Sequence, residues 1–311
     1  MMLWVSLFGM DKGRVEDTRF VAPHVALLGV QVFFGSLPVI AKVVLRTIPP
    51  TGLVGFRVGI TALVLMVVQA VRGRFWLREK SDYFKLAVLG FFGVTLNQIL
   101  FINGLSLTTA SNTSLLAVTI PIFTLAVSTL ARSERLRGVK VAGIILAAGG
   151  VLLIIDPRRA SFSSETTMGD LLIIANSLSY GIYVATSKQV IERNGAFRSM
   201  MWVFIFASVI CVPLGAYSLR TIDLNSIDSS IWALVIYIAV GATASPYLLN
   251  AWALARVYPS VVAVYIYLQP IIGFLLAVVF LGESIGGNFV LAATLIFAGV
   301  FMATRNRSAV R

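Results

Sequence analysis

Long apolar runs alternate with short polar segments along this chain, from about residue 23 to residue 304. Each run holds about 20 residues, which is the length that an α-helix needs to cross the hydrocarbon core of a bilayer. The pattern therefore predicts an all-α integral membrane protein with ten transmembrane helices. Their expected bounds are 23–45, 50–71, 83–104, 107–131, 138–155, 169–191, 196–219, 231–253, 258–281 and 288–304.

The last two predicted spans repeat an earlier part of the chain. Residues 258–304 align without a gap with residues 109–155, at a separation of 149 positions. Outside the large apolar residues, five positions coincide: Ser111 with Ser260, Pro121 with Pro270, Glu134 with Glu283, Gly138 with Gly287, and Gly150 with Gly299. Matches at one separation, together with matching hydropathy, indicate an internal duplication. We expect two five-helix repeats, 23–155 and 169–304, joined by a polar linker at 156–168.

The composition agrees with a membrane protein. Charged residues make up 12% of the chain, about half of the share in a soluble domain. The net charge of +12 would suggest nucleic acid as the partner of a soluble protein. Here the basic residues gather between the spans, where they determine orientation, so we expect the lipid bilayer and a small solute as partners, and no nucleic acid.

The Lys and Arg residues are divided unequally between the two sides of the predicted membrane. With a cytoplasmic N-terminus, 19 of the 25 face the cytoplasm and four face outward. We therefore place both tails, 1–22 and 305–311, in the cytoplasm. Because each repeat has five spans, the two repeats are inverted relative to each other, an architecture that recurs in secondary transporters.

Two motifs carry a family resemblance. Pro-x12-Glu-x3-Gly occurs in both halves, and FFGSLPVIAKVVL, with Gly35 and Lys42, precedes Arg57 in FRVGITAL. The second copy keeps Gly181 and Lys188, each 146 positions later, but has no partner for Arg57. Together with the five-plus-five duplication, these features resemble the EamA-type branch of the drug/metabolite transporter superfamily. The resemblance implies export of amino acids, related metabolites or toxic analogues across a bacterial inner membrane, and says little about the individual substrate.

Neutral polar residues within the spans are the substrate-binding candidates. On a helix, residues three or four apart share a face, so several of these residues project from the same side of their span. The duplication also pairs Gln98 with Tyr247, so we expect the polar faces to surround one central cavity. Each candidate could instead form a helix–helix hydrogen bond or an interfacial aromatic contact. The candidates are Gln31, Asn97, Gln98, Asn176, Tyr180, Tyr183, Tyr247, Asn250, Tyr265 and Gln269.

Two cations lie within the predicted spans. Arg57 could face the cavity and attract a substrate carboxylate, or bond the carbonyl ends of a neighbouring helix, and the second interpretation is favoured. Lys42 is nearer the outer end of its span. It is expected to extend to the membrane interface, with a place in the outer vestibule as the alternative.

Repeat-related Glu and Pro residues have structural interpretations. Glu134 and Glu283 each precede a span, and we expect each to cap the helix that follows it. Pro121 and Pro270 cannot bond the carbonyls of Ala117 and Ile266. The two prolines are therefore candidate hinges with free carbonyls for a substrate, or kinks used only in packing.

The acidic residues, the single Cys and the single His limit the possible mechanisms and protein classes. None of the 13 acidic residues lies in the middle of a span, which favours a facilitator or exchanger over a carboxylate-driven antiporter. One Cys and one His exclude a multi-cysteine metal site, so we expect no metal, cofactor or enzyme activity. Spans five and ten are rich in small residues, which suits packing against each other or in a homodimer.

These observations predict a transporter of small metabolites, with amino acids or related compounds first. An exchanger of phosphorylated solutes or nucleotide-sugars is the alternative on the same fold, but it would need several cations in the cavity. An integral-membrane enzyme would need an acid/base or metal cluster at membrane depth, and a receptor or scaffold would leave the duplication unexplained.

Overall fold

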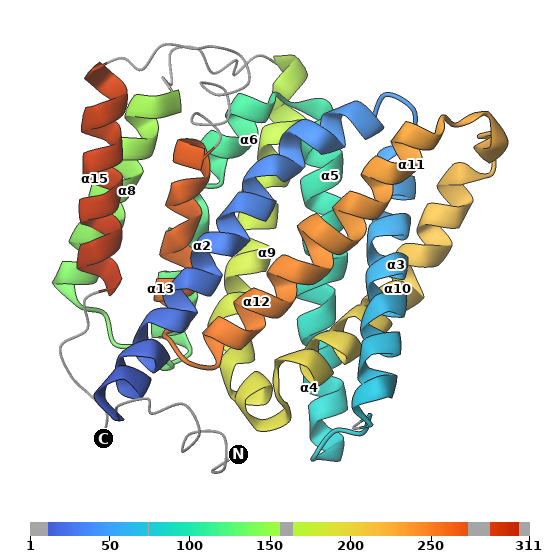
Figure 1. The fold of residues 1–311 in the computed structure, drawn as a ribbon. Helices are drawn as coiled ribbons and strands as arrows, with labels where there is room; N and C mark the ends of the chain where they lie inside the picture. The colour runs from blue at the N-terminus through green and yellow to red at the C-terminus, as the bar shows by residue number, and fades with distance from the viewer. Residues whose placement is uncertain (1–11, 74, 156–163, 273–286, 305–311) are drawn as a thin grey trace.

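The computed structural model describes residues 12–73, 75–155, 164–272 and 287–304, and in these ranges every regular element is a helix. Figure 1 shows the helices side by side, with α2 beginning and α15 ending at the lower face. The elements of the first repeat are α2 (Lys12–Val44), α3 (Pro50–Arg72), α4 (Lys80–Gly90), the π-helix η1 (Phe91–Leu96), α5 (Asn97–Leu107), α6 (Ala110–Leu116), α7 (Thr119–Leu130) and α8 (Gly138–Ile155).

The described residues of the second repeat form a similar series of helices. The series comprises α9 (Ser164–Asn194), α10 (Ala196–Leu219), the short η3 (Leu224–Ser226), α11 (Ser229–Ile236), the π-helix η4 (Tyr237–Ala244), α12 (Ser245–Leu254), α13 (Pro259–Val264), the 3-10 helix η5 (Tyr265–Leu268) and α15 (Gly287–Thr304).

Within the described residues, six helical stretches are long and apolar enough to cross a membrane. They are Val21–Val44, Pro50–Arg72, Lys80–Leu107, Thr166–Asn194, Ala196–Leu219 and Ser229–Leu254. The other four predicted spans correspond to shorter apolar helices, Thr119–Leu130, Gly138–Leu153, Pro259–Ile272 and Val290–Thr304. The protein is thus a multi-pass, all-helical membrane protein.

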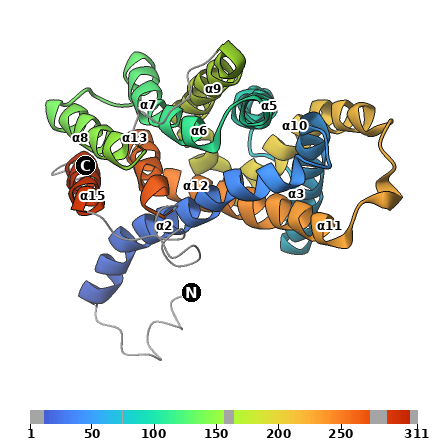
Figure 2. The ribbon, with the colours of Figure 1, turned by 90° about the horizontal axis from the view of Figure 1, so that it is seen from above.

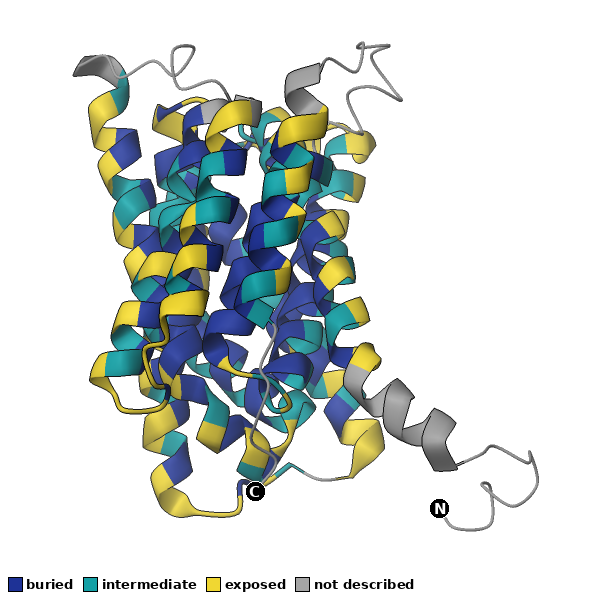
Figure 3. Ribbon diagram, turned by 90° about the vertical axis from the view of Figure 1, so that its left-hand side faces the viewer, coloured by how far each residue is buried: buried dark blue, intermediate teal, exposed yellow. Residues whose placement is uncertain are grey.

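Its outer surface is apolar. Val39, Leu63, Leu130, Ile145 and Phe301 all expose more than half of their side chains. Figure 3 shows such exposed positions on the outward faces of the helices and buried positions between them. A surface of this kind is unsuited to water, where large contiguous apolar patches are rare, and is suited to lipid.

The ends of two predicted spans differ from the structure. The first helix begins at Lys12, within the predicted tail, rather than at residue 23. The predicted span 107–131 is two helices, since Leu107 ends α5 and the turn at Ala117 and Val118 separates α6 from α7. Length and hydropathy detect an apolar run, but not a break inside it.

The predicted free carbonyls are occupied, which corrects the proline interpretation. The carbonyl of Ala117 accepts from the backbone N–H of Ile120 at 3.0 Å. In the second repeat, the carbonyl of Ile266 accepts from the N–H of Gln269. The helix therefore tightens to i→i+3 bonds just before Pro121 and Pro270, which satisfies both carbonyls locally.

Helix pairs reflect the duplication. The pairing of α5 with α9 has its counterpart in the pairing of α12 with α2, and α3 packs along α10. The two small-residue helices, α8 and α15, pack against each other and lie together in Figure 1. A Cβ added at Gly143 would lie 2.6 Å from the Gly299 carbonyl, and one at Gly150 would lie 2.7 Å from that of Ala292. Gly143 corresponds to Ala292, and Gly150 to Gly299, so the contact is reciprocal, as two-fold symmetry requires.

Two π-helices occupy overlapping positions of the two repeats. η1 corresponds to residues 240–245, and η4 covers Tyr237–Ala244. π-Helical turns are rare and are frequently found at functional sites. Both lie next to the cavity described below.

Candidate functional site

A cavity lies between the two repeats. It has a volume of about 90 Å³, and α2, α3, α5, α6, α7, α9, α12 and η5 contribute to its wall. Figure 2 shows these helices grouped around the centre, with α8 and α15 at one edge. The lining residues are Phe34, Leu37, Pro38, Arg57, Asn97, Gln98, Phe101, Thr113, Ala117, Ile120, Ile173, Asn176, Tyr180, Tyr247, Ile266 and Gln269.

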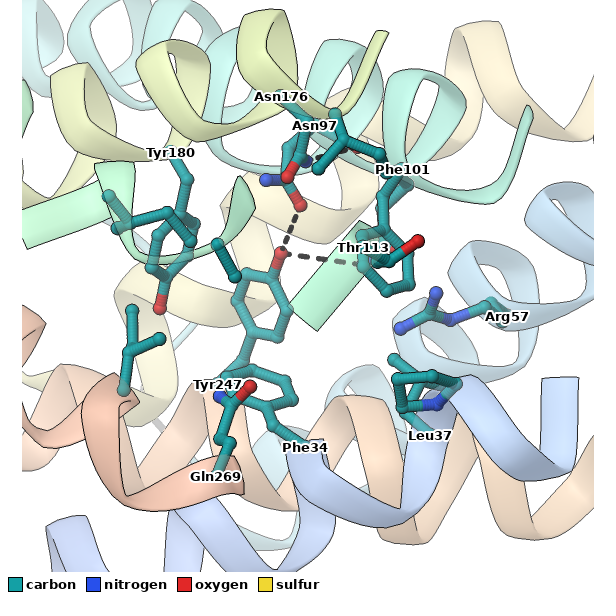
Figure 4. Close-up of a pocket in the computed structure, with 16 residues that line it drawn as sticks. Phe34, Leu37, Arg57, Asn97, Phe101, Thr113, Asn176, Tyr180, Tyr247 and Gln269 are labelled. Carbon is teal, nitrogen blue, oxygen red and sulfur yellow. Dashed lines mark hydrogen bonds between the residues drawn. The ribbon is translucent and has the colours of Figure 1, made fainter. Parts of the chain in front are cut away.

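Tyr247 occupies the centre of the polar wall (Figure 4). Its hydroxyl group lies 2.7 Å from the Gly93 carbonyl and 3.2 Å from Oδ1 of Asn97, the two acceptors for its proton. Nε2 of Gln98 donates to the same oxygen at 3.4 Å. Since Gln98 and Tyr247 are 149 positions apart, this contact joins equivalent residues of the two repeats.

A second contact joins equivalent residues in the same way. The hydroxyl group of Tyr267 donates to the carbonyl of Val118 at 3.1 Å, again across 149 positions. Residues related by a two-fold axis can touch each other only beside that axis. The pseudo-symmetry axis therefore passes through the cavity wall.

Arg57 is the one cation among the described lining residues. It is 2% exposed, and its Nε donates to Oγ1 of Thr243, in η4, at 3.0 Å. The favoured prediction, that Arg57 bonds the carbonyl ends of a neighbouring helix, is not what the structure shows. That arrangement belongs to Lys42, whose Nζ donates to the Thr108 carbonyl at 2.8 Å.

Four candidates lie outside the lining. Gln31 is buried and accepts from Nε2 of Gln269 at 2.9 Å. The hydroxyl group of Tyr183 contacts the sulfur of Met200, and Nδ2 of Asn250 donates to the hydroxyl group of Tyr180 at 2.8 Å. Tyr265 contacts Nδ1 of His24 at 2.7 Å. Gln31 and Asn250 thus support side chains of the cavity wall, while Tyr183 and Tyr265 pack beside it.

The sequence interpretation missed Thr113 and the apolar wall. Thr113 lines the cavity from α6, a helix that its apolar run did not separate from α7. Phe34, Leu37 and Phe101 bring apolar surface to the same space. Nothing in the sequence distinguishes these side chains from lipid-facing ones, because both surroundings favour apolar residues.

The repeat-related lysines hold helix ends. Lys42 bonds the carbonyl of Thr108, at the end of α5, and Lys188 bonds that of Val257, beyond α12, also at 2.8 Å. Thr108 and Val257 are themselves 149 positions apart. A cation at the C-terminal end of a helix is favoured by the helix dipole and satisfies a free carbonyl.

Glu134 caps a helix of the other repeat, which corrects the prediction. Its carboxylate accepts from the backbone N–H of Ser260, at the start of α13, and from the Ser260 hydroxyl group. It also forms a buried ion pair with Lys140. At the start of α8, the backbone N–H groups of Lys140 and Val141 donate to the carbonyl of Arg137, so Glu134 contacts this helix through the Lys140 side chain and does not cap it. Glu283, its counterpart, lies outside the described residues.

On the opposite face, Asp170 has a comparable role. It is 6% exposed and accepts from Oγ1 of Thr108 at 2.6 Å and from Nδ2 of Asn112 at 3.1 Å. Carboxylates therefore tie helix N-termini at both faces: Glu134 at the start of α13 and Asp170 at the start of α6. Neither residue lines the cavity.

The cavity contains Ile173 and Asn176 from the first half of α9, Tyr180 from its middle, and Arg57 from near the start of α3. Both helices begin at the upper face in Figure 1. Toward the lower face, every residue from Pro259 to Leu268 is buried.

Comparisons with known proteins agree with this geometry. The model of the EamA-like transporter family matches residues 22–156 and again residues 167–305. An uncharacterized transporter of Archaeoglobus fulgidus is 25% identical, with 90% of this chain and 96% of the relative covered. A probable amino-acid metabolite efflux pump of Salmonella typhimurium is 30% identical, with 58% of this chain and 62% of the relative covered. A solved crystal structure has a TM-score of 0.73 at 21% identity, covering 91% of this chain and 96% of the other, and supports the fold.

Proposed function

Since this chain belongs to the EamA-like transporter family, we propose that it is a ten-span, inverted-repeat transporter that exports or exchanges small metabolites by alternating access. Its relatives are transporters rather than enzymes. The observation that carries the proposal is the pairing of Gln98 with Tyr247 in the cavity wall. A solute held there touches equivalent positions of both repeats, which suits a site that opens to either side in turn.

The contacts at the lower face support an outward-facing conformation of this cycle. The lower face is closed by contacts of α13 and η5, namely Glu134 with Ser260 and His24 with Tyr265. We place that face in the cytoplasm, so the cavity described here is nearer the outside. Opening inward would separate these contacts.

Amino acids or related compounds are the proposed solutes. The cavity combines carboxamide and hydroxyl groups with aromatic and aliphatic walls, which suits a small amphipathic molecule. The relative named as an amino-acid metabolite efflux pump supports the same class. Phosphorylated solutes or nucleotide-sugars are less well suited, because Arg57 is the one cation among the described lining residues.

Removing a polar side chain from the cavity is expected to weaken transport. A hydrogen bond to a charged group contributes about 1.5–3 kcal/mol, so Asn97→Ala and Gln269→Ala should each raise the half-saturating concentration about ten- to a hundredfold. The assay is counterflow of labelled amino acids in proteoliposomes without a pH gradient. Asn103→Ala is the control, since Asn103 bonds the Ile99 carbonyl of its own helix, α5. Normal uptake by both cavity variants would place the transport pathway elsewhere.

The proposed orientation predicts a labelling pattern. In a Cys211→Ala background, Ser81→Cys should react with a membrane-impermeant maleimide only after the cells are opened. Ser226→Cys, between α10 and α11, should react in intact cells. Both serines are exposed. External labelling of Ser81→Cys would reverse the orientation and reassign the closed face.

A further inference from the structure

Arg57 is a buried cation without a matching anion. Its side chain is 2% exposed, and Nη1 has no hydrogen-bond partner among the described residues. No aspartate or glutamate is among the described residues that line the cavity. Burying an incompletely bonded charge is destabilising, and ionisable residues within membrane spans are commonly functional. A ligand that supplies the missing negative charge would remove this cost.

The side chain is held so that it points into the cavity. Nε donates to Oγ1 of Thr243, and the Thr243 hydroxyl group donates to the carbonyl of Ile238, in the π-helical segment. Figure 4 shows the guanidinium group projecting from α3 toward Tyr247. The π-helix thus fixes the Nε edge of the guanidinium group beside the cavity, while Nη1 stays buried without a hydrogen-bond partner among the described residues.

We infer that Arg57 binds a carboxylate group of the transported solute, and that the site discriminates against solutes whose only charge is positive. The inference rests on the proposed function, whose solute class it narrows. A guanidinium group offers a planar pair of donors that matches a carboxylate, and its single charge balances one negative charge. A phosphate monoester carries about −1.5 to −2 at pH 7, which one arginine does not balance. Lys42 does not line the cavity and bonds the Thr108 carbonyl instead.

Four probes vary the charged groups independently of the apolar part. L-Phenylalanine carries a carboxylate and an ammonium group, 3-phenylpropionate only the carboxylate, phenethylamine only the ammonium group, and phenyl phosphate a phosphate. Affinities would be measured by calorimetry on the purified protein. Wild type should bind 3-phenylpropionate and L-phenylalanine more tightly than phenethylamine or phenyl phosphate. Arg57→Gln should weaken binding of the two carboxylate probes about ten- to a hundredfold and leave that of phenethylamine unchanged or tighter.

The Arg57→Gln variant also distinguishes an arginine that binds the solute from one that only stabilises the fold. Because the empty protein buries this charge without a full set of partners, Arg57→Gln should raise its melting temperature. Arg57→Lys should keep part of the affinity for the two carboxylate probes. Lys42→Gln, which removes a cation that does not line the cavity, should keep all of that affinity. Lower stability of Arg57→Gln with an equal loss for all four probes would assign Arg57 a packing role and overturn the inference.

The remaining outcomes are also decisive. Failure of wild type to bind either carboxylate probe, or tighter binding of phenyl phosphate, would overturn the assignment of a carboxylate. Binding of carboxylates through Arg57 without their movement across proteoliposomes would instead reject the proposed transport function and keep the binding site.

Discussion

Replacing Lys140 with methionine is expected to lower the free energy of unfolding by about 3–5 kcal/mol, because Glu134 would keep a buried charge with no cation beside it. The side chains of Glu134 and Lys140 are 2% and 5% exposed. The ammonium group also lies 4.6 Å from the ring centroid of Tyr258. The loss should appear in equilibrium unfolding of the purified protein in mixed detergent and SDS.

The second partner and a surface lysine supply the controls. The double variant Glu134→Gln/Lys140→Met should recover most of the lost stability, because no unpaired charge remains. Lys85→Met removes a lysine that is 52% exposed and lies 3.8 Å from Asp82, so its ion pair should contribute only about 0–1 kcal/mol. Equal losses for Lys140→Met and Lys85→Met would show that the Glu134 contact is not a buried ion pair.

The same pair bears on transport. Glu134 belongs to the loop before α8 and Ser260 to α13, so their contact joins the two repeats at the proposed cytoplasmic face. Under the proposed mechanism, this contact must break whenever the cavity opens inward. A destabilised contact should therefore favour the inward-open conformation.

Much of the fold follows from sequence because membrane spans and duplications leave direct marks. Apolar runs locate the helices, and the separation of 149 positions predicted that Gln98 and Tyr247 occupy equivalent places. Their hydrogen bond arises because both also lie beside the pseudo-symmetry axis. The π-helices next to them have no comparable mark, since the extra residue in a π turn does not change local hydropathy.

Interactions between the repeats were harder to predict. Glu134 lies shortly before α8 in the chain, which suggested a cap on that helix. Packing of the inverted halves instead brings it to Ser260, 126 positions away. Lys42 and Arg57 were both recognised as unusual, but their roles depend on which helix end lies beside each one. Lys42 meets the open carbonyl of Thr108, while Arg57 meets Thr243 and the cavity.

The last prediction uses two adjacent glycines in α8. Gly150→Ala should destabilise the protein by about 1–3 kcal/mol, since its Cβ would lie 2.7 Å from the backbone oxygen of Ala292 and α8 would have to move away from α15. Gly149→Ala is the same chemical change one position earlier, where no atom lies within 4 Å of the added Cβ. There, alanine should stabilise the helix by about 0.5–1 kcal/mol. The same unfolding assay should therefore give effects of opposite sign.

Comparing Gly149→Ala with Gly150→Ala also tests whether the small residues of α8 serve a homodimer. The contact of α8 with α15 uses the face that contains Gly143 and Gly150, and the described structure leaves the surroundings of Gly149 open. If a second subunit packed against this open face, Gly149→Ala would disturb that contact. It would then lower the dimer fraction measured by cross-linking in the membrane. An unchanged oligomeric state, together with loss of stability only at Gly150, would show that the small residues of α8 serve contact between the repeats.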